Sequence, residues 1–271
     1  MLIAEIHGKV IKEARDREDY LTSAVFGHLR YIPPGVFWSE LFEHALGMEE
    51  GLTLTNSLRT NHIALARYSR LATHFWPKHP KFGDPDLILQ FSGEEVPSLF
   101  VLIEVKLWAG MSGSGKSGQV PRYMRLLDDL GALGFKVEKN DIKVLVYLTP
   151  RDSSKELEES LQAITEPENA RDHMFRLQWQ DILATARHVA NPYAVSIATD
   201  ATATILDDVA KFLDHRNLAY FSGFGQNDNL DNLTSEEASF YGTAKSLEGQ
   251  FQGMTEQSAF DFFHIKSGGW M

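Results

Sequence analysis

The sequence contains no cysteine. Disulfide bonds and metal sites built on thiolate ligands are therefore excluded. No apolar run approaches the roughly 20 residues that a membrane-spanning helix needs. The N-terminus, MLIAEIHGKVIKEARDRED, becomes charged too early to be a secretory signal. Together these absences predict a cytoplasmic protein with no membrane partner.

Several common catalytic signatures are also missing. The histidines are scattered, without the HExxH spacing of zinc enzymes. There is no G-x-S-x-G nucleophile elbow. An excess of basic residues is lacking too, because the formal net charge is −11. This charge argues against a protein that simply coats nucleic acid, but it leaves room for an enzyme with a local basic surface.

One such surface is suggested by the stretch from Gly51 to Gly83, which contains no Asp or Glu. Basic and aromatic residues are interleaved in it: Arg59, Arg67, Arg70, Lys78 and Lys81, with Tyr68, Phe75, Trp76 and Phe82. This pattern fits a phosphate-facing patch and equally fits an ordinary solvated surface, so both interpretations stay open.

The pattern of apolar residues predicts one α/β domain. Helical spacing predicts helices over 11–29, 37–46, 56–74, 118–130, 154–164, 181–189 and 201–214. Apolar and β-branched runs predict strands over 86–91, 99–108, 142–148 and 175–179, the first two joined as a hairpin. We therefore expect a mixed central β-sheet flanked by helices within residues 1–220, and a C-terminal extension of unknown role over 221–271.

Two charged residues interrupt the second strand of this hairpin, LFVLIEVKLW. Glu104 and Lys106 are two positions apart, so they emerge on the same face of the strand. Charged side chains in an apolar strand are costly to bury unless they are paired or bind an ion. If the hairpin strands are antiparallel neighbours, Asp86, at the start of the first strand, approaches Glu104 near the end of the second.

This arrangement suits a metal ion. Two carboxylates that are brought together repel each other unless a cation lies between them. Mg²⁺ prefers such oxygen ligands, with waters and a substrate phosphate completing its octahedron. The metal would activate a water for attack on a phosphodiester, and Lys106 would stabilise the developing charge or help to orient or deprotonate that water. By itself, a Glu-x-Lys pair on a strand fits an ion pair better, so the interpretation depends on Asp86.

Pro85-Asp86, a hairpin's length of chain, and then Glu104-x-Lys106 at the end of an apolar strand form a combined pattern. Over residues 11–150 the chain thereby resembles the PD-(D/E)XK nuclease superfamily. The resemblance implies a restriction-endonuclease-like fold. It also implies a Mg²⁺ (or Mn²⁺) ion bound by Asp86, Glu104 and the backbone carbonyl of Val105, with Lys106 beside the scissile phosphate.

Two further residues match the superfamily's pattern. Its members usually carry an acidic residue on the first core helix, and Glu18 fits because its spacing from Ile11 and Leu21 puts it on the apolar face. Many members also carry a Gln and an aromatic residue on the helix after the Glu-x-Lys strand, where this chain has Gln119 and Tyr123. We expect Gln119 to orient the attacking water, the lysine or a phosphate oxygen, and Tyr123 to pack in the core.

Residues 110–117, GMSGSGKS, satisfy the P-loop pattern G-x-x-x-x-G-K-[ST] and offer a rival interpretation. Three features weaken it. Pro121 would disturb a helix that starts at Lys116, but it is tolerated in the first turn of one that starts near Gly118. The preceding strand carries two charged residues, and the following strand ends in Thr149 rather than in an Asp that could hold Mg²⁺. We interpret the segment as a Gly/Ser-rich loop beside the nuclease site.

The predicted function is metal-dependent hydrolysis of phosphodiester bonds in nucleic acid, and in DNA in particular, in restriction, defence or repair. The alternatives are a P-loop nucleotide hydrolase that uses residues 110–117, and a non-catalytic, nuclease-like subunit that binds nucleic acid or serves in assembly. A homodimer would suit an enzyme that cuts both strands of a duplex. A separate partner protein, such as an ATPase or helicase, also stays open.

Overall fold

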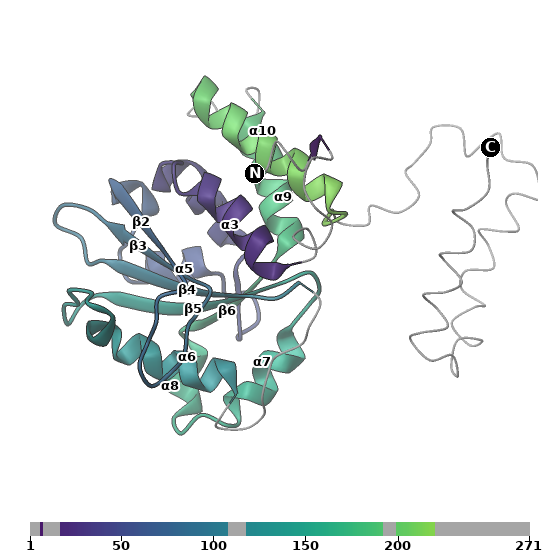
Figure 1. Ribbon diagram of the computed structural model, residues 1–271. Coiled ribbons are helices and arrows are strands. Elements are labelled where there is room, and N and C mark those ends of the chain that lie inside the picture. The colour runs from purple at the N-terminus through teal and green to yellow at the C-terminus, as the bar shows by residue number, and fades with distance from the viewer. Residues whose placement is uncertain (1–5, 8–16, 108–117, 192–198, 220–271) are drawn as a thin grey trace, which may run out of the picture. The chain divides into compact units, whose positions relative to one another are not determined.

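The computed structural model describes residues 6–7, 17–107, 118–191 and 199–219. A six-stranded mixed sheet lies between two layers of helices (Figure 1). This architecture confirms the predicted α/β class with a mixed central sheet. The predicted extension over 221–271 lies outside the described residues. Within the described ranges, no helix has both the length and the apolar character that crossing a membrane requires.

The sheet has the strand order β1-β6-β5-β4-β3-β2. β4 pairs with β5, and β5 with β6, in parallel, whereas the remaining neighbours are antiparallel. β3 and β4 form the predicted hairpin, and helical crossovers join the parallel strands, as parallel pairing requires. The strands are β1 (Leu46–Gly47), β2 (Arg70–Phe75), β3 (Leu87–Ser92), β4 (Leu99–Val105), β5 (Ile142–Thr149) and β6 (Met174–Gln178).

Helices cover both faces of the sheet (Figure 1). One face carries α3 (Glu18–Leu29), α4 (Ser39–His44), α5 (Leu54–Thr60), α9 (Trp179–Ala190) and α10 (Asp200–His215). The other carries α6 (Gln119–Asp128), α7 (Ser154–Leu161) and α8 (Pro167–Arg171). Shorter turns are η1 (Pro34–Trp38), η2 (Leu65–Arg67) and η4 (Leu130–Leu133). Because strand side chains alternate, β4 contributes Ile103 and Val105 to the first layer and Leu102 to the second.

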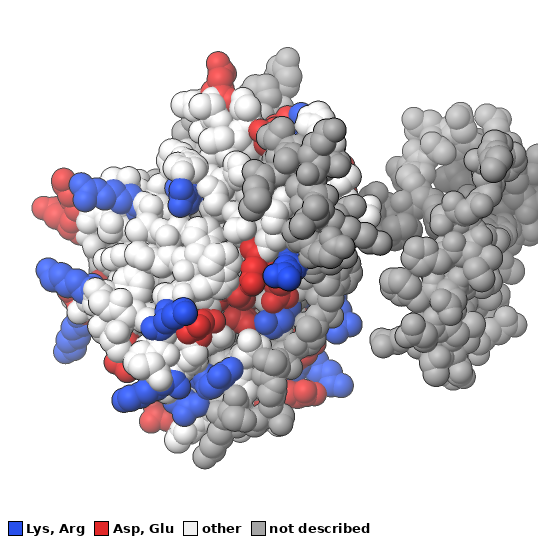
Figure 2. All heavy atoms as spheres, in the orientation of Figure 1, with Lys and Arg blue, Asp and Glu red and all other residues white. Residues whose placement is uncertain are grey.

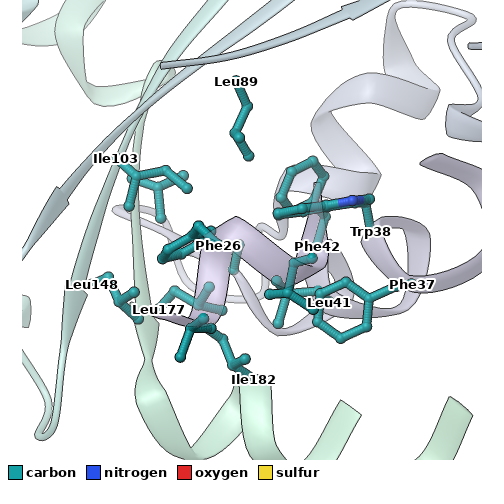
Figure 3. Close-up of a cluster of buried hydrophobic side chains, with 14 of the residues drawn as sticks. Phe26, Phe37, Trp38, Leu41, Phe42, Leu89, Ile103, Leu148, Leu177 and Ile182 are labelled. Carbon is teal, nitrogen blue, oxygen red and sulfur yellow. The ribbon is translucent and has the colours of Figure 1, made fainter. Parts of the chain in front are cut away.

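The core on the α3 side is rich in aromatic residues (Figure 3). The ring of Trp38 lies 6.0 Å from that of Phe42 and 5.8 Å from that of Phe91, which is on β3. Burying each large apolar side chain stabilises the fold by about 1.5–3 kcal/mol. Strands β3 and β4 are thereby held against a rigid layer, and the candidate site lies at their ends.

The predicted helix over 56–74 is wrong in its second half. α5 ends at Thr60, and His62 adopts a left-handed backbone with φ 59°. The chain then returns as β2, every residue of which pairs with β3. The backbone groups of β3 need a partner on this side, and tertiary pairing of that kind overrides a weak helical pattern.

Two other predicted helices begin or end elsewhere. Arg17 is extended, with ψ 132°, so α3 begins at Glu18, and the predicted helix over 11–29 does not run unbroken through that position. Its residues 11–16 lie outside the described ranges. The predicted helix over 37–46 is divided into η1 and α4, and its last residue, Leu46, pairs with Arg176 in the sheet. In both cases the helix boundary depends on backbone geometry, which the spacing of apolar residues does not predict.

Candidate active site

The candidate site lies where β3 begins and β4 ends. In the antiparallel register Leu87 pairs with Ile103, so Asp86, one residue before, lies opposite Glu104. Side chains directly opposite each other on one face have Cβ atoms about 4.5–5.5 Å apart. The Asp86 carboxylate also accepts a hydrogen bond from the Val105 amide, 2.8 Å from its Oδ2. The hairpin thus brings the two predicted metal-binding carboxylates together.

Glu104 is buried, with 1% of its surface exposed. Its Oε1 accepts hydrogen bonds from Lys106 Nζ and from Gln119 Nε2, both at 2.6 Å. Its Oε2 is buried and receives no hydrogen bond from a described residue. Burial, together with the neighbouring charge of Asp86, raises the pKa of Glu104 to about 8 even though Lys106 opposes the shift. One carboxylate oxygen is therefore left for a proton or a cation.

Lys106 follows β4 directly and is also buried. Its Nζ lies 3.6 Å from Glu18 Oε1, in addition to its contact with Glu104. Burial alone would lower the pKa of Lys106, but the carboxylates of Glu104, Glu18 and Asp86 outweigh it and hold the pKa above its usual value. The lysine is therefore kept positively charged in the middle of the carboxylates.

Glu18 and Gln119 reach the site from opposite layers, each as the first residue of a helix. Glu18 Oε2 accepts a hydrogen bond from the Leu107 amide at 2.7 Å. Burial raises the pKa of Glu18, and the charge of Lys106 opposes that shift. Because helix N-termini carry a partial positive charge, both α3 and α6 favour negative groups at this end of the sheet.

Tyr123, which we expected to serve only in core packing, has a second role. Its ring is buried beside α6's other apolar residues, and its hydroxyl donates to the Asp84 carbonyl at 3.2 Å. Asp84 and Pro85 lead into Asp86. Tyr123 therefore holds the segment that positions the first carboxylate, which is a contact that apolar spacing alone could not predict.

The P-loop-like residues 110–117 lie outside the described ranges. Their C-terminal neighbour Gly118 is extended, with ψ 158°, and α6 begins at Gln119. Pro121 thus falls in the first turn, where a missing amide is tolerated. The helix of a P-loop begins at its Gly-Lys dipeptide, whereas α6 begins at Gln119.

The donor set fits a divalent metal ion. Three carboxylates, from Asp86, Glu104 and Glu18, surround the single ammonium of Lys106, so negative charge is in excess. In the described part of the chain, no three His, Asp or Glu side chains form a ready-made metal cage. Mg²⁺ does not require one, because it is commonly held by one or two carboxylates, with waters completing its shell. Asp86 and Glu104, with the predicted carbonyl of Val105, would be its ligands.

Charged side chains are unevenly distributed over the surface. Figure 2 shows Asp and Glu side chains gathered near the middle of the face in view, with Lys and Arg side chains around them. An acidic centre that held a cation and was bordered by Lys and Arg could attract a phosphodiester chain, because the border would contact the flanking phosphates.

Sequence reasoning missed the residues on the far side of Lys106. The Trp179 indole Nε1, from the start of α9, donates to the Lys106 carbonyl at 3.1 Å. A small cavity beside Lys106 is lined by Thr149, the last residue of β5, and by Arg151 and Ser153, which follow that strand. These residues come to the site because β4 and β5 pair in parallel, which places the ends of both strands at one edge of the sheet, and the sequence pattern did not predict that pairing.

A larger pocket, of about 570 Å³, contains none of these site residues and is lined by residues of α6, of the start of β5 and of the α7–α8 region. Comparison of the chain with protein-family models, with curated proteins and with solved structures found no match. Any functional assignment therefore depends on the geometry described above.

Proposed function

We propose that the protein is a metal-dependent nuclease of the PD-(D/E)XK type that hydrolyses phosphodiester bonds, in particular in DNA. The observation that carries the proposal is the pairing of Asp86 with a buried Glu104 whose second oxygen has no donor, directly beside Lys106. Two buried carboxylates repel each other unless a cation lies between them. A site that nevertheless contains such a pair is a candidate for function.

Each residue has a role that follows from its contacts. Asp86 and Glu104 would hold Mg²⁺ or Mn²⁺, which when bound supplies an activated water and stabilises negative charge on the phosphate. Lys106 Nζ, kept protonated by its carboxylate neighbours, would donate to a non-bridging phosphate oxygen as charge develops there. Gln119 fixes the orientation of Glu104, and Glu18 holds Lys106 and the Leu107 amide in place.

The first test is cleavage of plasmid and single-stranded DNA with Mg²⁺ or Mn²⁺ and with EDTA. We expect cleavage by the wild-type protein only with metal. Lys106→Met should slow it about 10²- to 10³-fold, because one preorganised charge is lost while the aliphatic stem is kept. Lys136→Met, at a side chain that is 91% exposed, is the matched control and should cleave normally. Metal-independent cleavage, or a fully active Lys106→Met protein, would refute the proposal.

Metal binding can be measured without catalysis. A metal that binds only the folded state stabilises it by about 2.7 kcal/mol at a hundredfold excess over its Kd. For a domain of this size the expected rise in Tm is about 5–10 °C. Asp86→Asn should reduce the rise to under about 2 °C, since a neutral amide is a poorer ligand for Mg²⁺. Asp207→Asn, on the exposed face of α10, should keep it. An equal rise in both variants would place the metal elsewhere.

A further inference from the structure

Trp76 has an unusual backbone for a bulky side chain. It follows β2 directly and adopts a left-handed conformation with φ 46°. Such a conformation is strained for a residue other than glycine, and it persists only where the surroundings enforce it. Here the Trp76 amide donates to the carbonyl of Asp86 at 3.1 Å, and Pro77 follows. Trp76 is thereby bonded through its backbone to the residue that supplies one of the two proposed metal-binding carboxylates.

The side chain of Trp76 is presented to solvent and yet braced. It is 36% exposed, and Trp76 is one of three large hydrophobic residues exposed in the described chain. Its ring centroid lies 5.5 Å from that of Phe75, with the rings inclined at 40°. Phe75 itself packs against the core. One part of the indole is thus supported by the core while the remainder faces outward.

Trp76 also occupies the same register position across the sheet as the two carboxylates. Phe75 pairs with Leu87, so Trp76 lies opposite Asp86, which in turn lies opposite Glu104. Cα atoms of a hydrogen-bonded antiparallel pair are about 5.5 Å apart. The backbone of Trp76 therefore lies next to that of Asp86 and one strand away from that of Glu104.

The loop after Trp76 carries unpaired positive charge. Lys78 and Lys81 are exposed, and neither forms an ion pair with a described residue. The loop is fixed by the buried His79, whose Nδ1 accepts from the amides of Lys81 and Phe82 at 3.1 and 3.2 Å. Both lysines are thus presented from an ordered loop that leads back to Asp86, and they suit contacts with phosphates.

The two halves of the predicted basic and aromatic stretch separate in the structure. In the first half, Arg59 is paired with Glu43 at 2.7 Å and Tyr68 is buried, so these two residues serve the fold. The second half, Trp76 to Gly83, borders the candidate site, where Arg125 of α6 lies over the ring of Phe82. Within the described part of this stretch, the exposed aromatic residue is Trp76, and Lys78 and Lys81 close to it form no ion pair with a described residue.

We propose that Trp76 is a stacking platform for an unpaired base of single-stranded nucleic acid, with Lys78 and Lys81 contacting the flanking phosphates. This inference rests on the proposed function and narrows its substrate to single strands, or to single-stranded ends and flaps of duplexes. An aromatic side chain can stack only on a base whose face is free, and in the interior of a duplex both faces are covered by neighbouring bases. Every base has such a face, so the platform selects for strandedness rather than for sequence.

The test is the affinity for an oligo(dT) single strand and for a blunt duplex of equal length, measured by fluorescence anisotropy in EDTA so that no cleavage occurs. Trp76→Ala should raise the Kd for the single strand about fivefold to hundredfold and should leave the duplex within about twofold. Trp76→Phe, which keeps an aromatic face, should stay within about threefold of wild type. Tyr31→Ala removes another exposed aromatic ring, 64% exposed and at the other end of α3 from Glu18, and should change neither affinity.

A second readout separates stacking from a loss of folding. Addition of oligo(dT) should quench tryptophan fluorescence in the wild-type protein and in Tyr31→Ala, but far less in Trp76→Phe. Unchanged binding by Trp76→Ala, or an equal loss for single strand and duplex, would overturn the inference. Cleavage that needs metal but is indifferent to Trp76 would overturn it and leave the nuclease proposal standing. Binding that depends on Trp76, without cleavage in any metal, would support the stacking platform and overturn the nuclease proposal.

Discussion

Glu104→Ala is expected to lower metal-dependent cleavage at least about a thousandfold, which corresponds to ~4 kcal/mol of transition-state stabilisation. The change removes one of two carboxylates that would hold the metal. It also deprives Lys106 Nζ and Gln119 Nε2 of the oxygen that both contact at 2.6 Å. Rates measured on the substrate that the wild-type protein cleaves best, at saturating Mg²⁺ or Mn²⁺, provide the measurement.

The controls separate the lost charge from the lost side chain. Glu104→Gln keeps the size of the side chain and should be nearly as slow as the alanine variant, because the amide cannot neutralise a cation. Glu138→Gln, at an exposed position, should be fully active. Combining Asp86→Asn with Glu104→Gln should slow the reaction little beyond the slower single variant, since ligands of one metal act as a unit. Independent, multiplying losses would show that the two carboxylates do not share a metal.

Most of the site geometry could be predicted because it depends on the strand repeat. Alternation put Glu104 and Lys106 on one face, and hairpin pairing put Asp86 opposite Glu104. The structure places Asp86, Glu104 and Lys106 close to Gln119 and Glu18, which the sequence pattern also predicted as site residues. The catalytic roles of all five stay predictions. Glu18 lies at the first position of α3, whereas we expected it within a longer helix.

The parts that could not be predicted depend on contacts between distant segments. β2 was predicted as helix because the strand it pairs with, β3, begins 12 residues after β2 ends, so the pairing is not visible in the local sequence pattern. Trp179 bonds to the Lys106 carbonyl across 73 residues, and Tyr123 to the Asp84 carbonyl across 39. Side-chain bonds to backbone carbonyls leave no periodic trace in a sequence, so propensity and spacing cannot reveal them.

The largest expected effect on stability comes from Trp38→Ala. Trp38 is fully buried, and its ring lies between 5.4 and 6.4 Å from those of Phe26, Phe37, Phe42 and Phe91 (Figure 3). Truncating a buried aromatic side chain to alanine costs about 3–5 kcal/mol, because apolar contact is lost and a cavity remains. We expect the free energy of unfolding, measured by urea denaturation followed by circular dichroism, to fall by that amount.

A milder substitution tests the argument should the alanine variant fail to fold. Trp38 and Trp179 are both fully buried, but they differ at the indole nitrogen. No described residue accepts from Trp38 Nε1, whereas Trp179 Nε1 donates to the Lys106 carbonyl. Trp38→Phe removes an unsatisfied donor, and this gain should offset much of the lost ring volume. Trp179→Phe removes a hydrogen bond and leaves the buried Lys106 carbonyl without this donor, which should lower the free energy of unfolding by an additional ~1–3 kcal/mol.

The same pair of variants connects stability to the site. If the Trp179 bond fixes the end of β4, Trp179→Phe should slow cleavage several-fold at a temperature where the variant is fully folded, because Lys106 is then less well oriented. Trp38→Phe should cleave at the wild-type rate, since the ring of Trp38 contacts Phe26 and Phe91, which lie eight residues after Glu18 and five residues after Asp86 along the chain. Equal losses of stability in the two variants would contradict the hydrogen-bond argument. Unchanged cleavage by Trp179→Phe would show that other contacts hold Lys106, of which its ion pairs with Glu104 and Glu18 are the strongest candidates.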